Sequence, residues 1–170
     1  GLEHRIELLL TDYRDLQGQY DKLVSIEMIE AVGHQYYDTY FAKCSALLKP
    51  DGLMLLQAIT IADQRYDAAK HSVDFIQRYI FPGGMLPSVT RLRSQFDRAK
   101  LCFEDAVMFG DSYASTLREW RSRFLAAWST IEGLGFDDRF RRMWEMYLAY
   151  CEGGFRANAI DVGQFKLVRP

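Results

Sequence analysis

Residues 20–33 read YDKLVSIEMIEAVG, and the rest of the chain is organised around this stretch. Its centre, Leu23–Ile26, is a short apolar run with β-branched residues, which is typical of a strand buried on both faces in a parallel sheet. Glu27 and Glu30 follow this run, and Gly33 precedes a new helical pattern. The stretch therefore predicts a strand, a turn that carries two carboxylates, and the start of a helix.

The two acids after the strand, Glu27 and Glu30, have two interpretations. In open α/β sheets, ligands bind in the crevice beyond the carboxyl ends of the strands, where a carboxylate is better placed for chemistry than for packing. Glu30 is therefore the first candidate for a functional residue. Alternatively, both acids only favour the N-terminus of the following helix. This stretch alone leaves both interpretations open.

Composition describes an ordinary globular chain of 170 residues, 49% hydrophobic and 26% charged, which predicts one domain with a sizeable core. The net charge of −2 gives no case for nucleic-acid binding, which calls for a basic surface. Three well-separated cysteines indicate neither a disulfide framework nor a metal site, so reduced thiols in the cytosol are the natural interpretation. No apolar run approaches the roughly 20 residues that cross a bilayer.

The flanking sequence continues an α/β pattern. Upstream, Arg5–Leu10 is predicted to be a short strand. Downstream, a helix that begins near His34 ends at a turn over residues 50–52, and Leu53–Thr60 is a second buried strand, interrupted only by Gln57. Strand, helix and strand with short links predict a parallel unit with a right-handed crossover. The helix carries one apolar stripe, formed by Tyr37, Tyr40, Phe41, Cys44, Leu47 and Leu48.

The second half of the chain predicts four helices and two strands. Prolines and paired glycines interrupt the pattern at 81–87, and Ser88 can cap the helix that follows. Strands at Leu101–Phe109 and Ile160–Val168 are expected to pair like a hairpin. The result is one α/β domain with a mostly parallel sheet and an antiparallel element at its C-terminal side. The helices are expected at residues 63–80, 89–99, 113–131 and 137–156.

Seven strings in order carry a family resemblance: DYRDL, VSIEMIEAVG, YDTYFAKCSALLKPDG, LLQAITI, YIFPGGMLPS, FGDSYASTLREW and FRANAIDVGQFKLV. Together they closely resemble the C-terminal two-thirds of cyclopropane-fatty-acyl-phospholipid synthases and their mycolic-acid relatives. YIFPGGMLPS and FGDSYASTL are not general methyltransferase strings, so the resemblance is specific. It implies the S-adenosylmethionine-dependent methyltransferase fold, with a Rossmann-like, mostly parallel sheet.

The resemblance also implies that part of the catalytic domain lies outside this sequence. Family members begin with a strand and a glycine-rich loop that holds the methionine end of the cofactor, and an acidic residue after the second strand binds the ribose. Neither feature occurs here. Residues 1–170 are therefore expected to be the C-terminal part of a methyltransferase catalytic domain that lacks the first two strands, and to be inactive alone.

The activity implied by the resemblance is transfer of a methylene unit from S-adenosylmethionine to a cis double bond of a phospholipid acyl chain, which forms a cyclopropane ring. The alkene attacks the sulfonium methyl group, a carbocation develops, and a base removes a proton so that the ring closes. In this family the base is taken to be a bound bicarbonate. Methyl branching without ring closure is one alternative, and a non-catalytic lipid-binding fragment is another.

The implied catalytic residues are Glu30, Gln57 and Tyr113, which with Ile59 form the implied bicarbonate site. Glu30 and Tyr113 fall on the family's glutamate and tyrosine, and Ile59 follows the position whose backbone contributes to the site. Gln57 stands where many bacterial members have histidine, so it can hydrogen-bond to bicarbonate but cannot change protonation near neutral pH. The alternatives are a buried amide satisfied by backbone groups for Gln57 and a solvated first-turn hydroxyl for Tyr113.

For the cofactor, Tyr13 and Arg14 align with the segment that flanks the adenine, and Ile26 aligns with the strand-end residue near the sugar and adenine. No metal is implied. The implied partner is an unsaturated phospholipid acyl chain at a membrane surface, with a cytoplasmic, peripheral location; a homo-oligomer stays open. Six arginines either meet anionic headgroups or, with interleaved acids, form a solvated face: Arg118, Arg121, Arg123, Arg139, Arg141 and Arg142.

Overall fold

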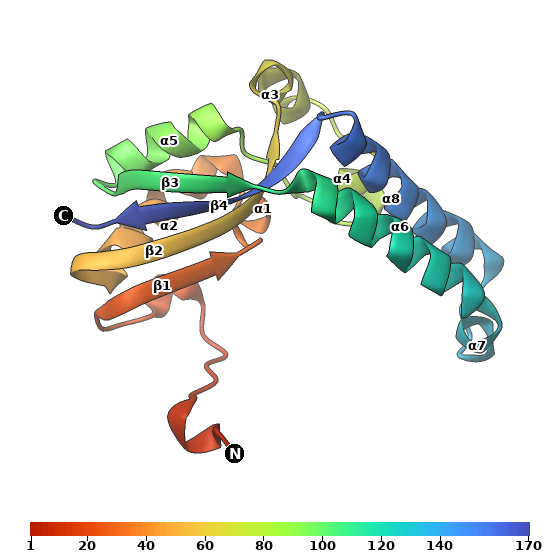
Figure 1. Cartoon of the computed structure of the whole chain (residues 1–170), viewed down its shortest axis with the longest axis horizontal. Helices are drawn as coiled ribbons and strands as arrows, with labels where there is room; N and C mark the ends of the chain where they lie inside the picture. The colour runs from red at the N-terminus through yellow and green to blue at the C-terminus, as the bar shows by residue number, and fades with distance from the viewer.

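The computed structural model describes residues 1–170, which form a four-stranded sheet in the order β1-β2-β4-β3 (Figure 1). β2 pairs parallel with β1, and β4 pairs antiparallel with both β2 and β3. The α/β class and the C-terminal antiparallel element are confirmed. Where a mostly parallel sheet was expected, the sheet is mixed, because only β1 and β2 run parallel. The strands are β1 (Tyr20–Ile26), β2 (Leu48–Ile61), β3 (Cys102–Met108) and β4 (Ile160–Val168).

Eight α-helices accompany the sheet. Two of them, α2 and α5, lie against one face, whereas α6 and α8 pack together and extend beyond the sheet with α7 at their tip (Figure 1). We call α6, α7 and α8 the arm. The helices are α1 (Ile29–Val32), α2 (Tyr37–Leu47), α3 (Asp63–Lys70), α4 (Phe75–Tyr79), α5 (Val89–Arg98), α6 (Gly110–Ala126), α7 (Trp128–Gly133) and α8 (Asp138–Arg156).

The parallel unit is β1–α2–β2, as the pattern of strand, helix and strand predicts. Its register places Ile26, the last residue of β1, beside Gln57 of β2. The turn expected at residues 50–52 lies inside β2, where Asp51 has a left-handed φ of 62°. The register of the two strands shifts there, between Tyr20 and Lys22. The unit therefore brings the carboxyl ends of β1 and β2 to the same edge of the sheet.

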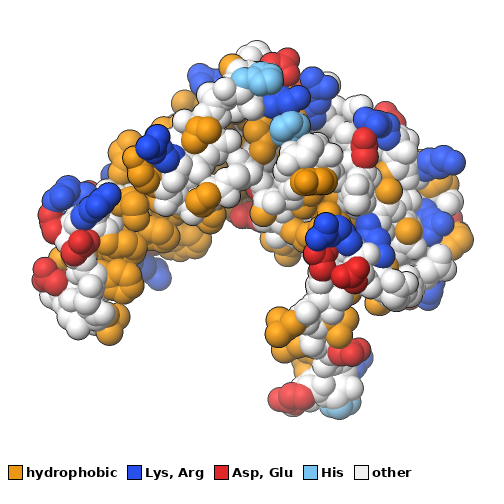
Figure 2. All heavy atoms as spheres, turned by 180° about the vertical axis from the view of Figure 1, so that it is seen from behind, with side chains coloured by type: hydrophobic (Ala, Val, Ile, Leu, Met, Phe, Trp, Pro, Cys, Tyr) orange, Lys and Arg blue, Asp and Glu red, His pale blue; other side chains and the backbone are white.

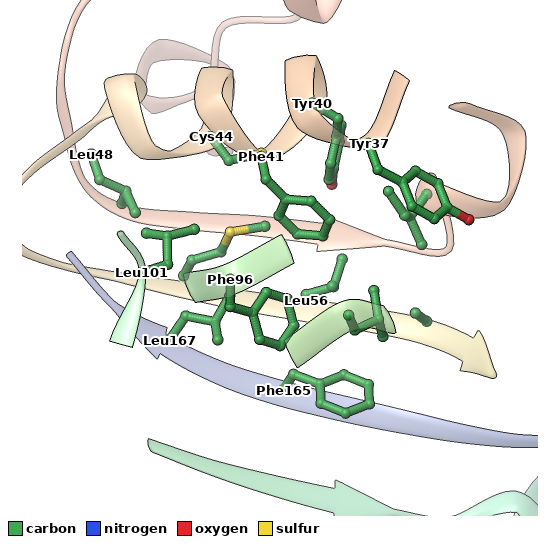
Figure 3. Packing of buried hydrophobic residues seen from close by; sticks show 14 residues of the cluster. Tyr37, Tyr40, Phe41, Cys44, Leu48, Leu56, Phe96, Leu101, Phe165 and Leu167 are labelled. Carbon is green, nitrogen blue, oxygen red and sulfur yellow. The ribbon is translucent and has the colours of Figure 1, made fainter. Parts of the chain in front are cut away.

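The main core lies between the sheet and the helices α2 and α5 (Figure 3). Phe41 of α2 meets Phe96 of α5 edge-on, with ring centroids 5.4 Å apart. Leu56 of β2 and Phe165 of β4 are fully buried below these rings. The six members of the predicted stripe are all buried, but only five of them lie on α2, because Leu48 is the first residue of β2. Burial of this apolar face is the main stabilising contribution to the α/β unit.

The opposite face of the sheet is open over β1, so the expectation that β1 is buried on both faces is wrong. In β1 only Ser25 is buried, whereas Val24 and Ile26 are each 61% exposed. Successive side chains of a strand point to opposite faces, and the helices α2 and α5 cover only one of them. Gln57 of β2 and its partner Gln164 of β4 belong to this opposite face, where α6 and α8 cover the start of β4 around the fully buried Val162.

Three other expected boundaries differ from the structure. Arg5–Leu10 is not a strand, because its residues have no hydrogen-bonded neighbour in the sheet; a 3-10 helix covers Glu3–Arg5 instead. The helix expected at 63–80 is two helices, since Asp74 and Gln77 form a capping box that starts α4. The helix expected at 113–131 begins at Gly110 and is divided at Ala127 into α6 and α7.

We expect Leu56→Ala to lower the free energy of unfolding by about 2–5 kcal/mol, because it leaves a cavity in a fully buried layer. The matched control is Leu134→Ala, which shortens a leucine that is 74% exposed and should change stability by less than about 0.5 kcal/mol. Urea unfolding followed by circular dichroism measures both values. Equal effects of the two substitutions would contradict the assignment of the core.

Candidate active site at the carboxyl ends of the parallel strands

A polar cluster lies where the pairing of β1 with β2 ends, on the face of the sheet that α2 and α5 do not cover. We define it by four residues, Glu27, Gln57, Tyr113 and Gln164, which are joined by side-chain hydrogen bonds. Glu27 directly follows β1, and its backbone N–H donates to the carbonyl oxygen of Gln57 at 2.9 Å. Ligands of open α/β sheets bind at this edge.

The side-chain amide of Gln57 is the centre of the polar cluster. Its Nε2 donates to Oε1 of Glu27 at 2.8 Å and to the hydroxyl oxygen of Tyr113 at 2.9 Å. Its Oε1 accepts from Nε2 of Gln164 at 2.9 Å. Gln57 is only 8% exposed, so these bonds satisfy an amide that water barely reaches. The alternative in which backbone groups satisfy this amide is not what the structure shows.

Tyr113 reaches the polar cluster from α6. Its ring packs against Phe109 and Phe155, with centroids 5.6 and 5.5 Å away, and its hydroxyl donates to Oε1 of Glu27. Burial, followed by the hydrogen bond to the Glu27 carboxylate, raises the pKa of Tyr113 to about 12. The hydroxyl therefore keeps its proton at neutral pH and acts as a donor. The alternative of a solvated hydroxyl does not describe this residue.

Glu30 belongs to α1, but its carboxylate reaches β2. Its Oε1 accepts the backbone N–H of Ile59 at 2.6 Å, and its Oε2 is buried without a partner. Burial raises the pKa of Glu30, the hydrogen bond from Ile59 opposes this shift, and the Glu27 carboxylate adds to it. Glu30 is therefore more than an acid in the first turn of a short helix.

The structure thus joins the four residues of the predicted bicarbonate site in two pairs, Glu30 with Ile59 and Gln57 with Tyr113. Glu27 was not among the predicted catalytic or binding residues, although it was noted as an acid after the strand, and Gln164 was not predicted at all. Glu27 stood at the strand end, but nothing in the pattern indicated its left-handed φ of 49°. Gln164 is the polar residue of β4 that faces Gln57, which only the strand register reveals.

A bound bicarbonate would need free hydrogen-bond donors, and the donors of this site already have acceptors within the chain. Both protons of the Gln57 amide nitrogen, the Tyr113 hydroxyl proton and the Ile59 N–H have acceptors within the chain. The one buried polar atom left over here is Oε2 of Glu30, which is an acceptor of hydrogen bonds. The residues in this arrangement therefore do not fit a bound bicarbonate.

The three residues predicted to bind the cofactor lie near one edge of the sheet but do not form one contact. Ile26 is exposed beside the polar cluster, at the end of β1. Tyr13 packs edge-on against Tyr40 of α2, with centroids 5.5 Å apart. Arg14 binds the carboxylate of Asp12 through two hydrogen bonds of 3.0 and 2.7 Å, so its guanidinium is already paired.

A separate shallow cavity of about 190 Å³ lies beyond the end of β2, beside the start of α3. It contains none of the predicted site residues, and its walls include Asp63 and Asp161. Both carboxylates serve as local caps, because Asp63 accepts from Thr90 and Asp161 accepts from the N–H of Gly110. No group of three or more His, Cys, Asp or Glu side chains is placed to hold a metal ion.

The arm combines exposed apolar side chains with paired arginines. Of the six arginines considered as headgroup contacts, four form ion pairs within the chain. None of the helices is long and apolar enough to cross a membrane. The exposed large apolar side chains of the arm region are Trp120, Leu125, Leu134, Phe136, Met146 and Tyr150.

Comparison with known proteins places these features in a family. Residues 1–165 match the family described as mycolic acid cyclopropane synthetase. The chain is 47% identical over 170 residues to the tuberculostearic acid methyltransferase UfaA1 of Mycobacterium tuberculosis, covering 99% of this chain and 40% of that protein. It is 44% identical over 160 residues to the cyclopropane-fatty-acyl-phospholipid synthase of Escherichia coli, with coverage of 94% and 40%. The chain thus spans about 40% of these relatives, less than the two-thirds expected.

Solved structures show the same fold. The cyclopropane synthase MmaA2 from Mycobacterium tuberculosis superposes with a TM-score of 0.84 at 27% identity, covering 94% of this chain and 59% of that one. The mycolic acid cyclopropane synthase CmaA1, complexed with SAH and CTAB, superposes with a TM-score of 0.85 at 28% identity and the same coverage. The chain therefore has a partial Rossmann-like methyltransferase fold.

We expect the substitution Glu30→Gln to change how stability depends on pH. Burial raises the pKa of Glu30, so the folded protein binds this proton more tightly than the unfolded chain does. The contribution of Glu30 is therefore present at low pH and lost as pH rises through the folded-state pKa. Glutamine does not titrate, so the stability of Glu30→Gln relative to wild type should rise from about pH 4 to about pH 7. Urea unfolding across this range measures the difference, and a constant difference would contradict the burial of an ionisable Glu30.

Proposed function

This chain belongs to the mycolic acid cyclopropane synthetase family, and we propose that it carries the proton-handling part of a lipid-alkylating active site. In this proposal, residues 1–170 are the C-terminal part of a methyltransferase catalytic domain. The proposed reaction adds a methylene unit to a cis double bond of a phospholipid acyl chain. The observation that supports it most directly is the polar cluster at the carboxyl end of the sheet, with the half-buried Glu30 beside it.

S-adenosylmethionine, when bound, supplies an electrophilic methyl group for the alkene of the acyl chain. The exposed Ile26, beside the polar cluster, offers an apolar surface that suits an aromatic base. Tyr13, held against Tyr40, would border the same region. Arg14 would have to leave Asp12 to contact the cofactor, so we assign it no contact.

The residues of this chain handle charge and protons. After methyl transfer the acyl chain carries a positive charge, and a proton must leave before the ring can close. The ring of Tyr113 is placed to attract a cation, an effect that strengthens where water is excluded. The acceptors at the site are the carboxylates of Glu27 and Glu30, and Gln57 orients the first of them. The site is thus suited to removing a proton from a cationic substrate.

Bicarbonate is the base that the family resemblance implies. It would need donors from Gln57 and Tyr113, and both already donate to Glu27. It would also lie beside two carboxyl groups, and like charges repel at short range. We therefore derive no step through bicarbonate in this chain.

The arm is the proposed contact with the acyl chain and the membrane surface. Figure 2 shows the molecule as an arch, with hydrophobic side chains gathered along the inner side of the limb that the arm forms. Exposed apolar area of this kind marks interaction sites for lipids or proteins. We propose peripheral association with lipid from the cytoplasmic side, with the paired arginines as a solvated outer face rather than as headgroup ligands.

A second candidate reaction is methyl branching of a fatty acyl chain on the same scaffold. It is favoured by one observation, the 47% identity with a protein named as a tuberculostearic acid methyltransferase. Both reactions share the methyl transfer and differ in which proton leaves the cation. A lipid-binding role without catalysis would not explain the polar cluster.

Mass spectrometry of lipids tests the proposal. The complete protein that contains these residues is incubated with S-adenosylmethionine and vesicles of a monounsaturated phospholipid. We expect each product acyl chain to gain one CH₂ and to lose its reactivity as an alkene, which indicates a ring. A gain of CH₂ with an alkene retained would favour the branching reaction. No mass change would contradict both reactions.

We expect Glu30→Gln to lower turnover in this assay and to leave the affinity for S-adenosylmethionine nearly unchanged. Loss of the buried carboxylate should cost about 1–3 kcal/mol of transition-state stabilisation, because Oε2 is an unpaired acceptor inside the site. The control is Glu104→Gln, which removes a carboxylate that pairs with Lys166 outside the site. Turnover of Glu30→Gln equal to that of the control would remove Glu30 from the catalytic residues.

A further inference from the structure

We propose that Glu27 is the catalytic base of this site, so that its carboxylate takes the place of an external bicarbonate. The inference rests on the proposed function, because a base is needed only if the acyl chain becomes a cation. It assigns a role to a residue that the family resemblance does not include. Four observations support it: the left-handed backbone of Glu27, the hydrogen bonds that its carboxylate accepts, the negative charge of the neighbouring Glu30, and the exposure of the Glu27 side chain.

The backbone of Glu27 is held in an unusual conformation. Its φ is 49°, in the left-handed region that residues with a side chain rarely adopt, and such positions persist only where the surroundings enforce them. The N–H of Glu27 donates to the carbonyl oxygen of Gln57 at 2.9 Å, which extends the β1–β2 pairing by one bond. This backbone turns the side chain back toward the amide of the same Gln57.

The carboxylate of Glu27 uses the donors that an external anion would need. Its Oε1 accepts from the Gln57 amide at 2.8 Å and from the Tyr113 hydroxyl. The second proton of the Gln57 amide goes to the Tyr113 oxygen at 2.9 Å. Gln164 holds the other end of the same amide, which keeps its nitrogen directed at Glu27. The arrangement is that of a carboxylate bound in an anion site.

The local charge also disfavours a second anion. Glu27 and Glu30 are close enough that the charge on Glu27 raises the pKa of Glu30. A bicarbonate ion placed between them would be repelled by both carboxylates. In a protein without Glu27, only the Glu30 carboxylate would repel it. Gln57 cannot itself carry a proton away, because an amide does not titrate. The titratable acceptor in contact with Gln57 and Tyr113 is Glu27.

The proposed step is a single proton transfer. The substrate is the carbocation formed when the acyl chain has received its methyl group. The electron pair of one methyl C–H bond forms the third bond of the ring and neutralises the cation, and the proton moves to Oε2 of Glu27. Both hydrogen bonds to the Glu27 side chain go to Oε1, so Oε2 is the oxygen left to take the proton. The side chain is exposed, so the proton can then pass to water.

Glu27→Gly and Glu27→Gln test this role in the complete protein that contains these residues. Glycine tolerates the left-handed backbone, so the first variant should fold and leave a gap the size of the carboxylate. The matched control is Asp51→Gly, which removes another acid with a left-handed φ, 62°, away from the site. Circular dichroism and thermal unfolding confirm that each variant is folded before activity is measured.

Turnover is measured in buffer freed of carbon dioxide and again with added bicarbonate. We expect wild type and Asp51→Gly to be equally active in both buffers. Glu27→Gly and Glu27→Gln should lose about 10²-fold or more without bicarbonate, the usual contribution of a general base. Added bicarbonate should restore activity to Glu27→Gly, where there is room for it. Wild-type turnover that requires bicarbonate, or Glu27→Gly turnover equal to wild type without it, would overturn the proposal.

A binding measurement separates this inference from the proposed function. ¹³C-labelled bicarbonate is titrated with each protein and its NMR line width is followed. We expect broadening by Glu27→Gly and none by wild type or Asp51→Gly. If wild type alkylates no lipid at all, the proposed function fails, and this measurement still decides on Glu27. Binding by both wild type and Glu27→Gly, or by neither, would overturn the assignment of Glu27 to an anion site.

Discussion

A buried amide in the central strand must have all its hydrogen bonds made, and the site depends on how this chain makes them. Gln57 is 8% exposed, and its partners are Glu27 after β1, Tyr113 on α6 and Gln164 on β4. An unpaired buried donor or acceptor costs about 1–3 kcal/mol, so the three partners are not interchangeable with apolar residues. Satisfying Gln57 therefore links two strands and the arm to one point at the edge of the sheet.

The one-sided sheet explains why this point is available for chemistry. Helices α2 and α5 cover one face with the aromatic core around Phe41 and Phe96, whereas the other face is open over β1 and is covered by the arm over part of β4. Alternation along β2 places Leu56 in the core and Gln57 on the opposite face. The same alternation in β4 separates Phe165 from Gln164. Packing and chemistry thus use opposite faces of the same strands.

The local features and the two expected strand pairings, β1 with β2 and β3 with β4, were predicted well from the sequence, whereas the covering of the sheet and the contacts of the polar cluster were not. The stripe of α2, the cap at Ser88 and the strand at Ile160–Val168 follow from periodicity and turn chemistry, and they are confirmed. The covering of β1 was wrongly predicted, because an apolar run does not reveal whether helices lie on one face or two. Glu27 and Gln164 were not assigned, because their roles depend on a left-handed φ and on the register of β4 with β2.

The proposed site depends on the hydrogen bond that the Tyr113 hydroxyl donates to the Glu27 carboxylate. The pKa of Tyr113 reports on this hydrogen bond. NMR of ¹³C-labelled tyrosine resolves this residue, with Tyr113→Phe used to assign its signal. We expect a pKa of about 12 for Tyr113 in wild type. We expect a lower pKa in Glu27→Gln, because the carboxylate that opposes ionisation is gone while the burial stays. An identical pKa in both proteins would contradict a hydrogen bond between Tyr113 and Glu27.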